Sequence, residues 1–408
     1  MQDLLSPPEI TPELIRRFDI SGPRYTSYPT ADRFVEAFGW ADYERALEQR
    51  RTGPAAAQGR PLSIYVHLPF CQSLCYYCAC NKIITKHHDR AAPYLQYLRR
   101  ELELHLAHMG RGAAVSQLHL GGGTPTFLSD EELRWLMDLL RSHFNFQPGG
   151  EYSIEIDPRT VTAERLHALR ELGFNRLSFG VQDFDPEVQK AVHRVQPAEQ
   201  VFALVADARR LGFDSVNVDL IYGLPKQNAQ SFARTLAQVC ELRPDRIALY
   251  AYAHLPERFK PQRRIIMIDL PAPDAKVGML ASALKTFMQA GYVYVGMDHF
   301  ALPEDALAVA KRQGRLQIEQ KSLEAIEKEA KRIEIITVER IMVEFNKIML
   351  SEKPSVGLEI MKKTRLLDIV LPELTALEGI EEVEGQKHKD NFWHTLEVVD
   401  IWLYVNEF

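Results

Sequence analysis

The sequence lacks long apolar runs, a basic surplus and scattered cysteines. No stretch approaches the roughly 20 consecutive apolar residues of a membrane span, so we expect no transmembrane helix and no signal peptide. The formal net charge is −6, which gives no overall reason to expect nucleic acid or an anionic membrane as a partner. Only five of the 408 residues are cysteine, and four of these lie close together. This usage fits a reducing cytoplasm better than a disulfide-rich secreted protein.

The four clustered cysteines are Cys71, Cys75, Cys78 and Cys80, in the run HLPFCQSLCYYCACNK. The first three have the spacing C-x3-C-x2-C, and three thiolates are one fewer than an iron–sulfur cubane normally takes. Such a cluster keeps one iron open for a small molecule. Zinc motifs usually pair two C-x2-C units, and no second unit is present. Zinc and metal-free thiols remain alternatives, whereas a disulfide is not expected because Cys240 lies far away in the sequence.

Short apolar runs alternate with helical patterns in the body of the chain, from residue 63 to residue 316. The runs predicted as strands are Ser63–Pro69, Gln117–Gly123, Glu151–Pro158, Arg176–Gln182, Ser215–Pro225 and Arg246–His254. Apolar spacings of three and four predict helices between them, including 91–107 and 129–144, the second with a capping box of Ser129 and Glu132. Six strand–helix repeats predict an α/β fold with a parallel sheet, either doubly wound or curled into a barrel.

Polar residues and glycines gather where these predicted strands end. They are Cys71, Gly121–Pro125, Glu155 and Asp157, Gln182 and Asp183, Asp219 and Tyr222, and Ala253 and His254. Folds of this kind place their chemistry at the carboxyl ends of strands. A glycine triplet alone is more often a tight turn than a ligand site. On one rim with three thiols, however, its backbone N–H groups could meet a charged ligand, and the carboxylates could bind an ammonium or hydroxyl groups.

The segment from about residue 22 to residue 316 closely resembles the oxygen-independent coproporphyrinogen III oxidases, which are radical S-adenosylmethionine (SAM) enzymes. The matching phrases are GPRYTSYPTA, YVHLPFC, HLGGGTPTFL, EIDPR, FGVQDF, VHRVQ, VDLIYGLPKQ, YAHLPERFKPQRR and GMDHFALPEDALAVAKRQGRL. The resemblance implies a partial, six-unit (β/α) radical barrel. It also implies oxidative decarboxylation of two propionates of coproporphyrinogen III to vinyl groups, giving protoporphyrinogen IX through a 5′-deoxyadenosyl radical.

The same resemblance assigns site residues. Cys71, Cys75 and Cys78 would hold a 4Fe–4S cluster, and Cys80 would not be a ligand. One or two SAM molecules would be contacted by Tyr65, Tyr77, Gly122, Gly123, Thr124, Glu155, Gln182, Arg194, Asp219 and Ala253. For Arg194, a surface cation after a helix is an equal alternative. No catalytic residue is assigned, because His67, His119, His254 and His299 are interpreted as structural. The expected partners are the porphyrinogen substrate and an electron donor such as flavodoxin, with a monomer in the cytoplasm.

The resemblance stops near Leu316, and the family's further C-terminal domain is not found. Residues 317–408 hold 12 Lys and Arg against 19 Asp and Glu. They resemble the helical neck and body of bacterial CCA-adding tRNA nucleotidyltransferases, followed by the start of an HD-type module. The paired aspartates and the HD doublet of those proteins are missing, so His388 and His394 are interpreted as orphaned rather than metal ligands.

Three segments are therefore expected: an N-terminal arm and extension over 1–62, the barrel over 63–316, and a helical tail over 317–408 that is a foreign fragment. Two alternatives to an active enzyme remain. A haem chaperone of the same superfamily is disfavoured by Cys80 and by GPRYTSYPTA. An inactive chimera with an RNA-binding helical fragment is disfavoured by the acidic tail, because RNA affinity depends on neutralising phosphates.

Overall fold

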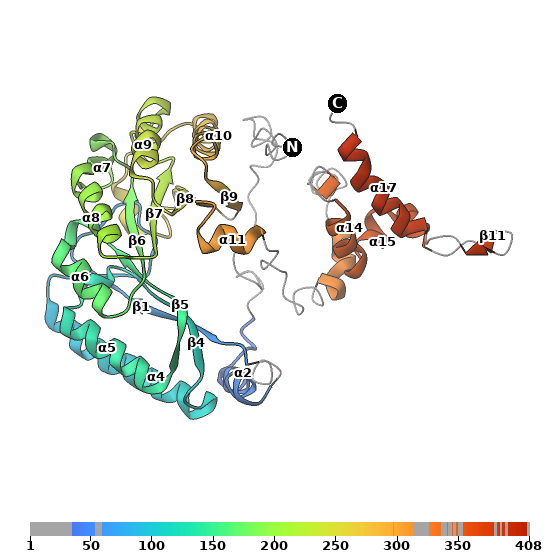
Figure 1. Cartoon of the computed structure of the whole chain (residues 1–408). Coiled ribbons are helices and arrows are strands. Elements are labelled where there is room, and N and C mark those ends of the chain that lie inside the picture. The colour runs from blue at the N-terminus through green and yellow to red at the C-terminus, as the bar shows by residue number, and fades with distance from the viewer. Residues whose placement is uncertain are drawn as a thin grey trace. The chain divides into compact units, whose positions relative to one another are not determined.

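The computed structural model describes residues 35–53, 59–296, 298–312, 326–335, 341, 345, 348–349, 354–378, 382–383, 386–387 and 391–405. The chain divides into two compact units, Met1–Gln313 and Gly314–Phe408 (Figure 1). The Tyr25–Pro29 part of the expected N-terminal arm lies outside the described residues. In the described ranges, no helix has the length and apolar character needed to cross a membrane.

The first unit is built on one eight-stranded sheet. In spatial order its strands are β1 (Leu62–Leu68), β4 (Ala114–Gly122), β5 (Asn145–Ile156), β6 (Arg176–Gln182), β7 (Ser215–Tyr222), β8 (Arg246–Ala251), β10 (His299–Ala301) and β9 (Val293–Gly296). The first six pair in parallel, which confirms the predicted parallel sheet. They follow one another in chain order with no reversal, so the sheet curls like a barrel wall rather than being doubly wound. The antiparallel strands β9 and β10 were not predicted.

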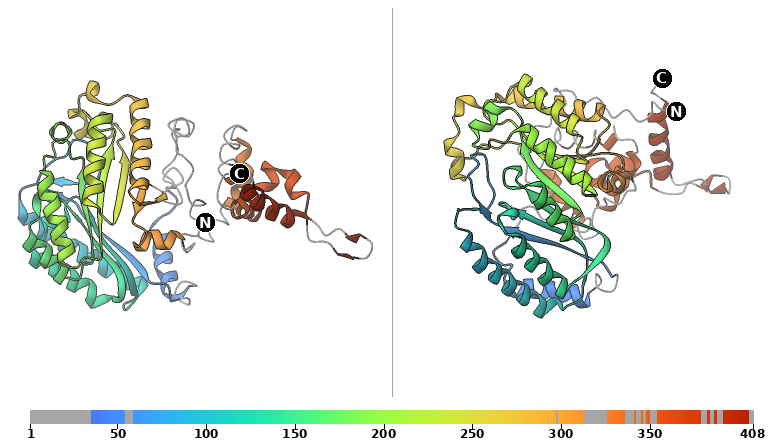
Figure 2. Two further views of the ribbon diagram at one scale, coloured as in Figure 1. Left: turned by 45° about the horizontal axis from the view of Figure 1, so that its top comes forward. Right: turned by 60° about the vertical axis from the view of Figure 1, so that its left-hand side comes forward.

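Helices follow the parallel strands and lie on the outer side of the curved sheet (Figures 1 and 2). They are α4 (Ala91–Met109), α5 (Asp130–His143), α6 (Ala163–Glu171), α7 (Pro186–Ala191), α8 (Ala198–Arg210), α9 (Ala229–Leu242) and α10 (Pro273–Gln289). The predicted capping box of α5 is confirmed: Ser129 Oγ accepts from the Glu132 N–H at 3.2 Å, and the Ser129 N–H donates to Glu132 Oε2 at 2.8 Å.

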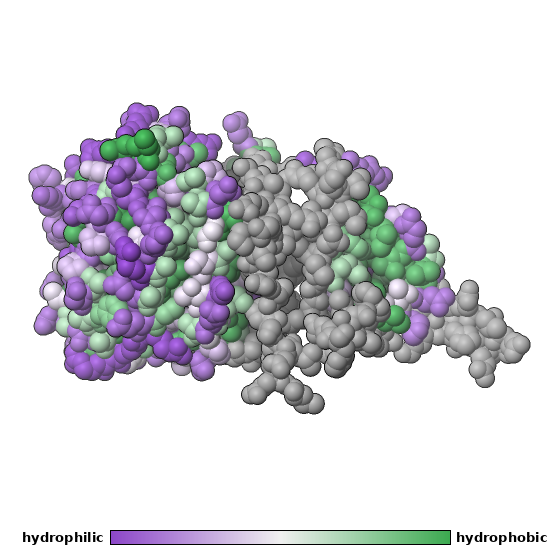
Figure 3. Space-filling view, turned by 90° about the horizontal axis from the view of Figure 1, so that it is seen from above, coloured by the Kyte–Doolittle hydropathy of each residue, from purple (hydrophilic) through white to green (hydrophobic). Residues whose placement is uncertain are grey.

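Shorter elements complete the first unit. They are α2 (Trp40–Thr52), α11 (Ala306–Arg312), the strand pair β2 (Phe70–Cys71) and β3 (Ile83–Ile84), and the 3₁₀ turns η2 (His88–Arg90), η3 (Pro125–Phe127), η4 (Pro158–Thr160), η5 (Lys260–Arg264) and η6 (Met267–Asp269). Hydrophilic residues cover much of this unit on the face seen in Figure 3.

The parallel strands alternate between an apolar and a polar face. Leu118, Ile154, Leu177, Val218 and Ile247 are at most 1% exposed and belong to the main hydrophobic core. Their neighbours in sequence include His119, Glu155, Ser178 and Asp219, which line a cavity instead. Strands of all-parallel sheets are usually apolar on both faces because helices or core cover both. Polar groups on the second face indicate that it is built to receive a polar ligand.

The second unit has its own small core. Its described elements are η7 (Ala330–Ile335), α14 (Pro354–Lys363), α15 (Leu367–Val370), α16 (Pro372–Thr375), β11 (Glu382–Val383), β12 (Gln386–Lys387) and α17 (Asn391–Val405). Leu358, Met361, Leu367, Phe392 and Leu396 form the core. Phe345, Ile348 and Met349 pack against it. His388 lies outside the described residues, and His394 is exposed on α17.

Candidate cofactor site

A cavity of about 870 Å³ lies where the parallel strands of the first unit end. It is lined by the three predicted cluster ligands, Cys71, Cys75 and Cys78, and by Tyr77, Gly122, Gly123, Thr124, Glu155, Gln182, Arg194, Asp219 and Ala253. Tyr65 is the one predicted site residue that does not line it. Its side chain is 58% exposed and stacks on His119, with ring centroids 5.9 Å apart. The structure thus brings the predicted residues together, and their binding roles remain predictions.

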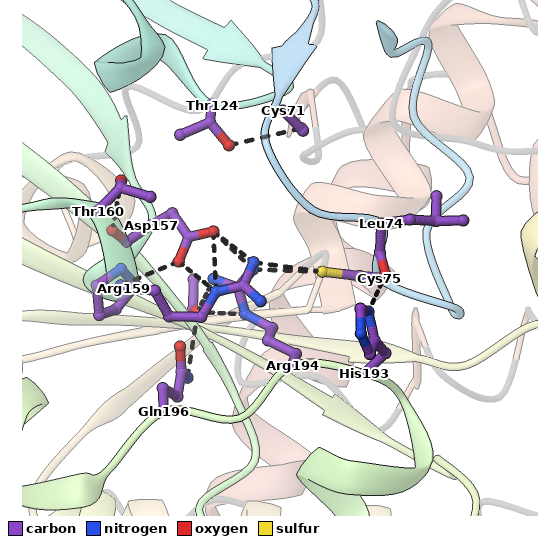
Figure 4. Close-up of polar contacts among 12 residues, drawn as sticks. Cys71, Leu74, Cys75, Thr124, Asp157, Arg159, Thr160, His193, Arg194 and Gln196 are labelled. Carbon is purple, nitrogen blue, oxygen red and sulfur yellow. Dashed lines mark hydrogen bonds and ion pairs between the residues drawn. The ribbon is translucent and has the colours of Figure 1, made fainter. Parts of the chain in front are cut away.

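Two of the cysteine sulfurs accept hydrogen bonds from side chains elsewhere in the first unit (Figure 4). Thr124 Oγ1 donates to Cys71 Sγ at 3.5 Å. Cys75 is buried, and its Sγ accepts from Arg194 Nη1 at 3.5 Å and from Arg159 Nη2 at 3.7 Å. Two guanidinium groups therefore converge on one cysteine sulfur.

Cys78 and Cys80 differ in character although they are two residues apart. A hydrogen bond from Cys80 lowers the pKa of Cys78 to about 6, and the same contact raises the pKa of Cys80. Lys82 Nζ donates to the backbone oxygens of both, at 3.0 and 3.2 Å. This arrangement makes Cys78 the better thiolate of the two, in line with the predicted ligand set.

The three thiols share one cavity without forming a tight cage. Among the described residues, no three His, Cys, Asp or Glu side chains are grouped so that they could hold a single metal ion. A cubane cluster bonds each thiolate to a different iron. The donor set of three cavity-facing thiols with N–H and O–H donors around them fits such an anionic iron–sulfur group.

Asp157 orients the two guanidinium groups at Cys75. It forms ion pairs with Arg194 at 3.2 Å and with Arg159 at 2.7 Å. Burial alone would raise the pKa of Asp157, but the two arginines outweigh burial and lower it. Arg194 is 7% exposed and also donates to the Gly180 carbonyl, so its interpretation as a surface cation is wrong. Arg159 was not predicted; its signal is its place two residues after Asp157 in EIDPR.

The glycine turn is sterically required. A Cβ at Gly123 would lie 2.6 Å from the Pro69 carbonyl oxygen, and Gly122 has φ +117°. The Gly122 N–H donates to Glu155 Oε2 at 3.0 Å, and Glu155 Oε1 lies 3.3 Å from His119 Nε2. The turn is therefore a close packing of strand ends, and it also fixes the Glu155 carboxylate at the cavity wall.

Asp219 lies on the same wall. Its oxygens accept from Asn217 Nδ2 at 2.8 Å and from Ser178 Oγ at 3.3 Å. Burial, together with the neighbouring Glu155, raises the pKa of Asp219 to about 6. A carboxylate held in this way is destabilised until a cation or a hydrogen-bond donor joins it.

Asp219→Asn is expected to stabilise the ligand-free protein at pH 7.5 and to leave it unchanged near pH 3.5. The folded pKa, about 6, exceeds the ordinary value of 3.8. The free-energy cost that ionised Asp219 imposes on folding is therefore absent below the unfolded pKa, grows as pH rises, and is complete above the folded pKa. After an allowance for solvent access we expect about 2 kcal/mol, measured by urea unfolding at both pH values. An equal gain at both would show that the change acts through packing rather than ionisation.

Three of the histidines interpreted as structural are held by hydrogen bonds, and one of these, His119, lines the cavity. His67 Nε2 bonds the Asn81 carbonyl at 2.9 Å, His119 Nδ1 bonds Ser153 Oγ at 2.7 Å, and His254 Nδ1 bonds Tyr252 Oη at 2.8 Å. These partners agree with the structural interpretation of the three. His299 also lines the cavity.

Gln262 is a second residue that sequence reasoning missed. It is 1% exposed, and its amide donates to the backbone oxygens of Tyr77 and Ala253, both at 3.1 Å. It thus ties the cysteine loop to the end of β8. No periodicity or motif in the sequence singles out a glutamine for this role.

Comparison with known proteins agrees with this geometry. The description "Radical SAM superfamily" matches residues 65–239, and "Probable RNA and SrmB-binding site of polymerase A" matches residues 315–378. The oxygen-independent coproporphyrinogen III oxidase of Pseudomonas aeruginosa is 56% identical over 307 residues, which cover 75% of this chain and 66% of that protein. That of Escherichia coli is 51% identical over 303 residues, covering 74% and 65%.

A solved structure supports the same relationship. Coproporphyrinogen III oxidase from Escherichia coli, described as a radical SAM enzyme, superposes with a TM-score of 0.66 at 50% identity. The match covers 71% of this chain and 65% of that one. The chain thus spans slightly less than two thirds of the length of these relatives.

A curved parallel sheet with three spaced thiols at its carboxyl rim defines the class of the first unit: it is a radical SAM type of domain, and its residues 65–239 match that superfamily. Within the superfamily, its high-identity relatives are the oxygen-independent coproporphyrinogen III oxidases. Both statements confirm the resemblance found in the sequence. The second unit carries the polymerase-type match, consistent with the nucleotidyltransferase-like tail.

Proposed function

We propose that this protein catalyses the anaerobic oxidative decarboxylation of two propionates of coproporphyrinogen III. The observation that carries the proposal is one cavity in which four thiols, three guanidinium groups and three carboxylates converge. The identity to the coproporphyrinogen oxidases supports the choice of substrate. Cys80, which the chaperone branch typically lacks, disfavours a haem chaperone.

Cys71, Cys75 and Cys78 would hold a 4Fe–4S cluster, and the opposite wall would hold one or two SAM molecules. When bound, these groups supply a 5′-deoxyadenosyl radical by reductive cleavage of SAM. Glu155 and Asp219 offer carboxylates for an ammonium or for ribose hydroxyls. Arg194 and Arg159 would balance negative charge on the cluster. The protein's task is to orient the groups and to keep water out.

The same change takes place at each of the two propionates. One hydrogen atom leaves the β-carbon, the bond to the carboxylate breaks to release carbon dioxide, and one electron passes to an acceptor. A vinyl group remains. An electron donor such as flavodoxin is needed to reduce the cluster.

The direct test is an anaerobic assay of the holo-protein for protoporphyrinogen IX formed from coproporphyrinogen III. Product formation that depends on SAM and a reductant would support the proposal. Release of 5′-deoxyadenosine without any decarboxylation would contradict the substrate assignment. Absence of iron after reconstitution would contradict the cofactor assignment.

Glu155→Ala is expected to weaken SAM binding about tenfold or more while the iron content stays the same. Its carboxylate lies on the cavity wall, and losing a charge-assisted hydrogen bond costs about 1.5–3 kcal/mol. Calorimetric titration of reconstituted protein with SAM measures the change. Glu164→Ala, on the exposed first turn of α6, is the matched control. Unchanged SAM affinity in Glu155→Ala would make Glu155 only a support for the glycine turn.

A further inference from the structure

An exposed surface adjoins the loop that carries the cysteines. It consists of the cations Arg258, Lys260, Arg263 and Arg264 and the apolar side chains Ile266, Met267 and Ile268; we name it the η5–η6 surface. The three apolar side chains are 63%, 67% and 89% exposed. All seven residues lie within eleven positions of the sequence.

This surface contacts the cysteine loop directly. Arg264 lies over the Tyr76 ring at 5.3 Å, and His193 stacks on the same ring with centroids 5.1 Å apart. Tyr76 follows Cys75 in the chain, and its N–H donates to the Val192 carbonyl at 2.9 Å. The η5–η6 surface therefore contacts the cysteine loop at Tyr76, the residue next to Cys75 in the chain.

The charge of the surface is unbalanced. Within the described residues, none of its four cations takes part in an ion pair, while the nearby Asp269 is paired with Lys226 at 2.5 Å. Glu257 is the other acidic residue of this stretch. Exposed apolar side chains rimmed by charge mark interaction sites, and arginine and methionine are enriched at protein interfaces.

We propose that the η5–η6 surface is the docking site of a small acidic one-electron carrier protein. The inference rests on the proposed function, which requires that the cluster be reduced. A partner with acidic groups around an apolar centre complements the four cations and the apolar side chains. Docking here places the carrier beside the loop that carries Cys75, which Arg264 contacts through Tyr76. The step moves one electron from the reduced carrier to the cluster, and no covalent bond forms or breaks.

The test uses the full reconstituted chain and measures cluster reduction by stopped-flow absorbance under anaerobic conditions. The probe is an acidic flavodoxin in its hydroquinone form. Lys260→Glu/Arg263→Glu is expected to lower the second-order rate at least about tenfold at low ionic strength, because charge steering changes association rates by 10- to 1000-fold. Raising the salt concentration should shrink the difference between variant and parent. Dithionite should reduce both proteins at the same rate.

Arg134→Glu/Lys285→Glu is the control, since it reverses two exposed cations on the outer helices α5 and α10. It should leave the flavodoxin rate within twofold of the parent. Equal rates in both double variants would overturn the proposal. A change from dimer to monomer by light scattering, with an unchanged flavodoxin rate, would assign the surface to a second copy and also overturn it. A parent protein without iron would instead refute the proposed function.

Discussion

Cys71→Ala, Cys75→Ala and Cys78→Ala are each expected to abolish the iron–sulfur cluster, whereas Cys80→Ala should retain it. The three predicted ligands line the cavity and receive hydrogen bonds from Thr124, Arg194 and the Cys80 thiol. Each of these three substitutions leaves the cubane with only two protein thiolates, so a second iron lacks its cysteine ligand.

The measurement is the iron content after anaerobic reconstitution, together with 5′-deoxyadenosine release from SAM. We expect about four irons in the parent and in Cys80→Ala, and close to none in the other three variants. Cys240→Ala, in helix α9, is a control for thiol removal as such. Equal iron loss in all four cluster-loop variants would contradict the ligand assignment. Zinc in place of iron would contradict the whole interpretation of the site.

Arg246→Ala is expected to destabilise the first unit by about 3–5 kcal/mol, the usual cost of breaking a buried ion pair from one side. Arg246 is 5% exposed at the start of β8. Its guanidinium contacts Glu151 Oε2 at 2.7 Å and Asp305 Oδ1 at 2.6 Å. Removing it leaves the Asp305 carboxylate, whose side chain is 3% exposed, without its charge partner. Arg176, the other ion-pair partner of Glu151, lines the cavity. The loss of Arg246 should therefore also loosen the cavity wall at Arg176.

Urea unfolding followed by circular dichroism measures this effect. Arg210→Ala removes an ion pair with Asp207 of similar length, 2.7 Å, but the Arg210 side chain is 69% exposed. The control should change stability by less than about 0.5 kcal/mol, because exposed pairs contribute little. Comparable losses of stability in Arg246→Ala and Arg210→Ala would show that the ion pairs of Arg246 are not a buried, coupled unit.

The sequence predicted the parallel strands well because each is an apolar run with clear ends. β6 was predicted at both ends, Arg176 and Gln182. The hairpin of β9 and β10 was missed because four- and three-residue strands carry too little pattern to detect. The strand pattern alone did not decide between a barrel and a doubly wound sheet, since that depends on which strands pair; the family resemblance predicted the barrel, and the strand order confirms it.

In the candidate site, too, sequence motifs indicated some residues and missed others. Spacing and motifs drew attention to the cysteines, the glycine turn, Glu155 and Asp219. They gave no sign of Gln262, which joins Tyr77 and Ala253 across 185 and 9 positions of the chain. Nor could they decide between a buried and an exposed Arg194, because its contacts with Asp157, Cys75 and Gly180 form only in the folded chain.

The sequence by itself determined the class of fold, the cysteine spacing and the resemblance to the radical SAM oxidases, because these reside in local patterns and in runs of matching residues. Tertiary structure alone decided which charges meet. It aimed Arg159 and Arg194 at the Cys75 sulfur and placed a basic, apolar surface next to Tyr76. It also buried Asp219, beside Glu155, and so raised the pKa of Asp219. Charge interactions and desolvation depend on distances between residues far apart in the chain, and those distances exist only once the chain has folded.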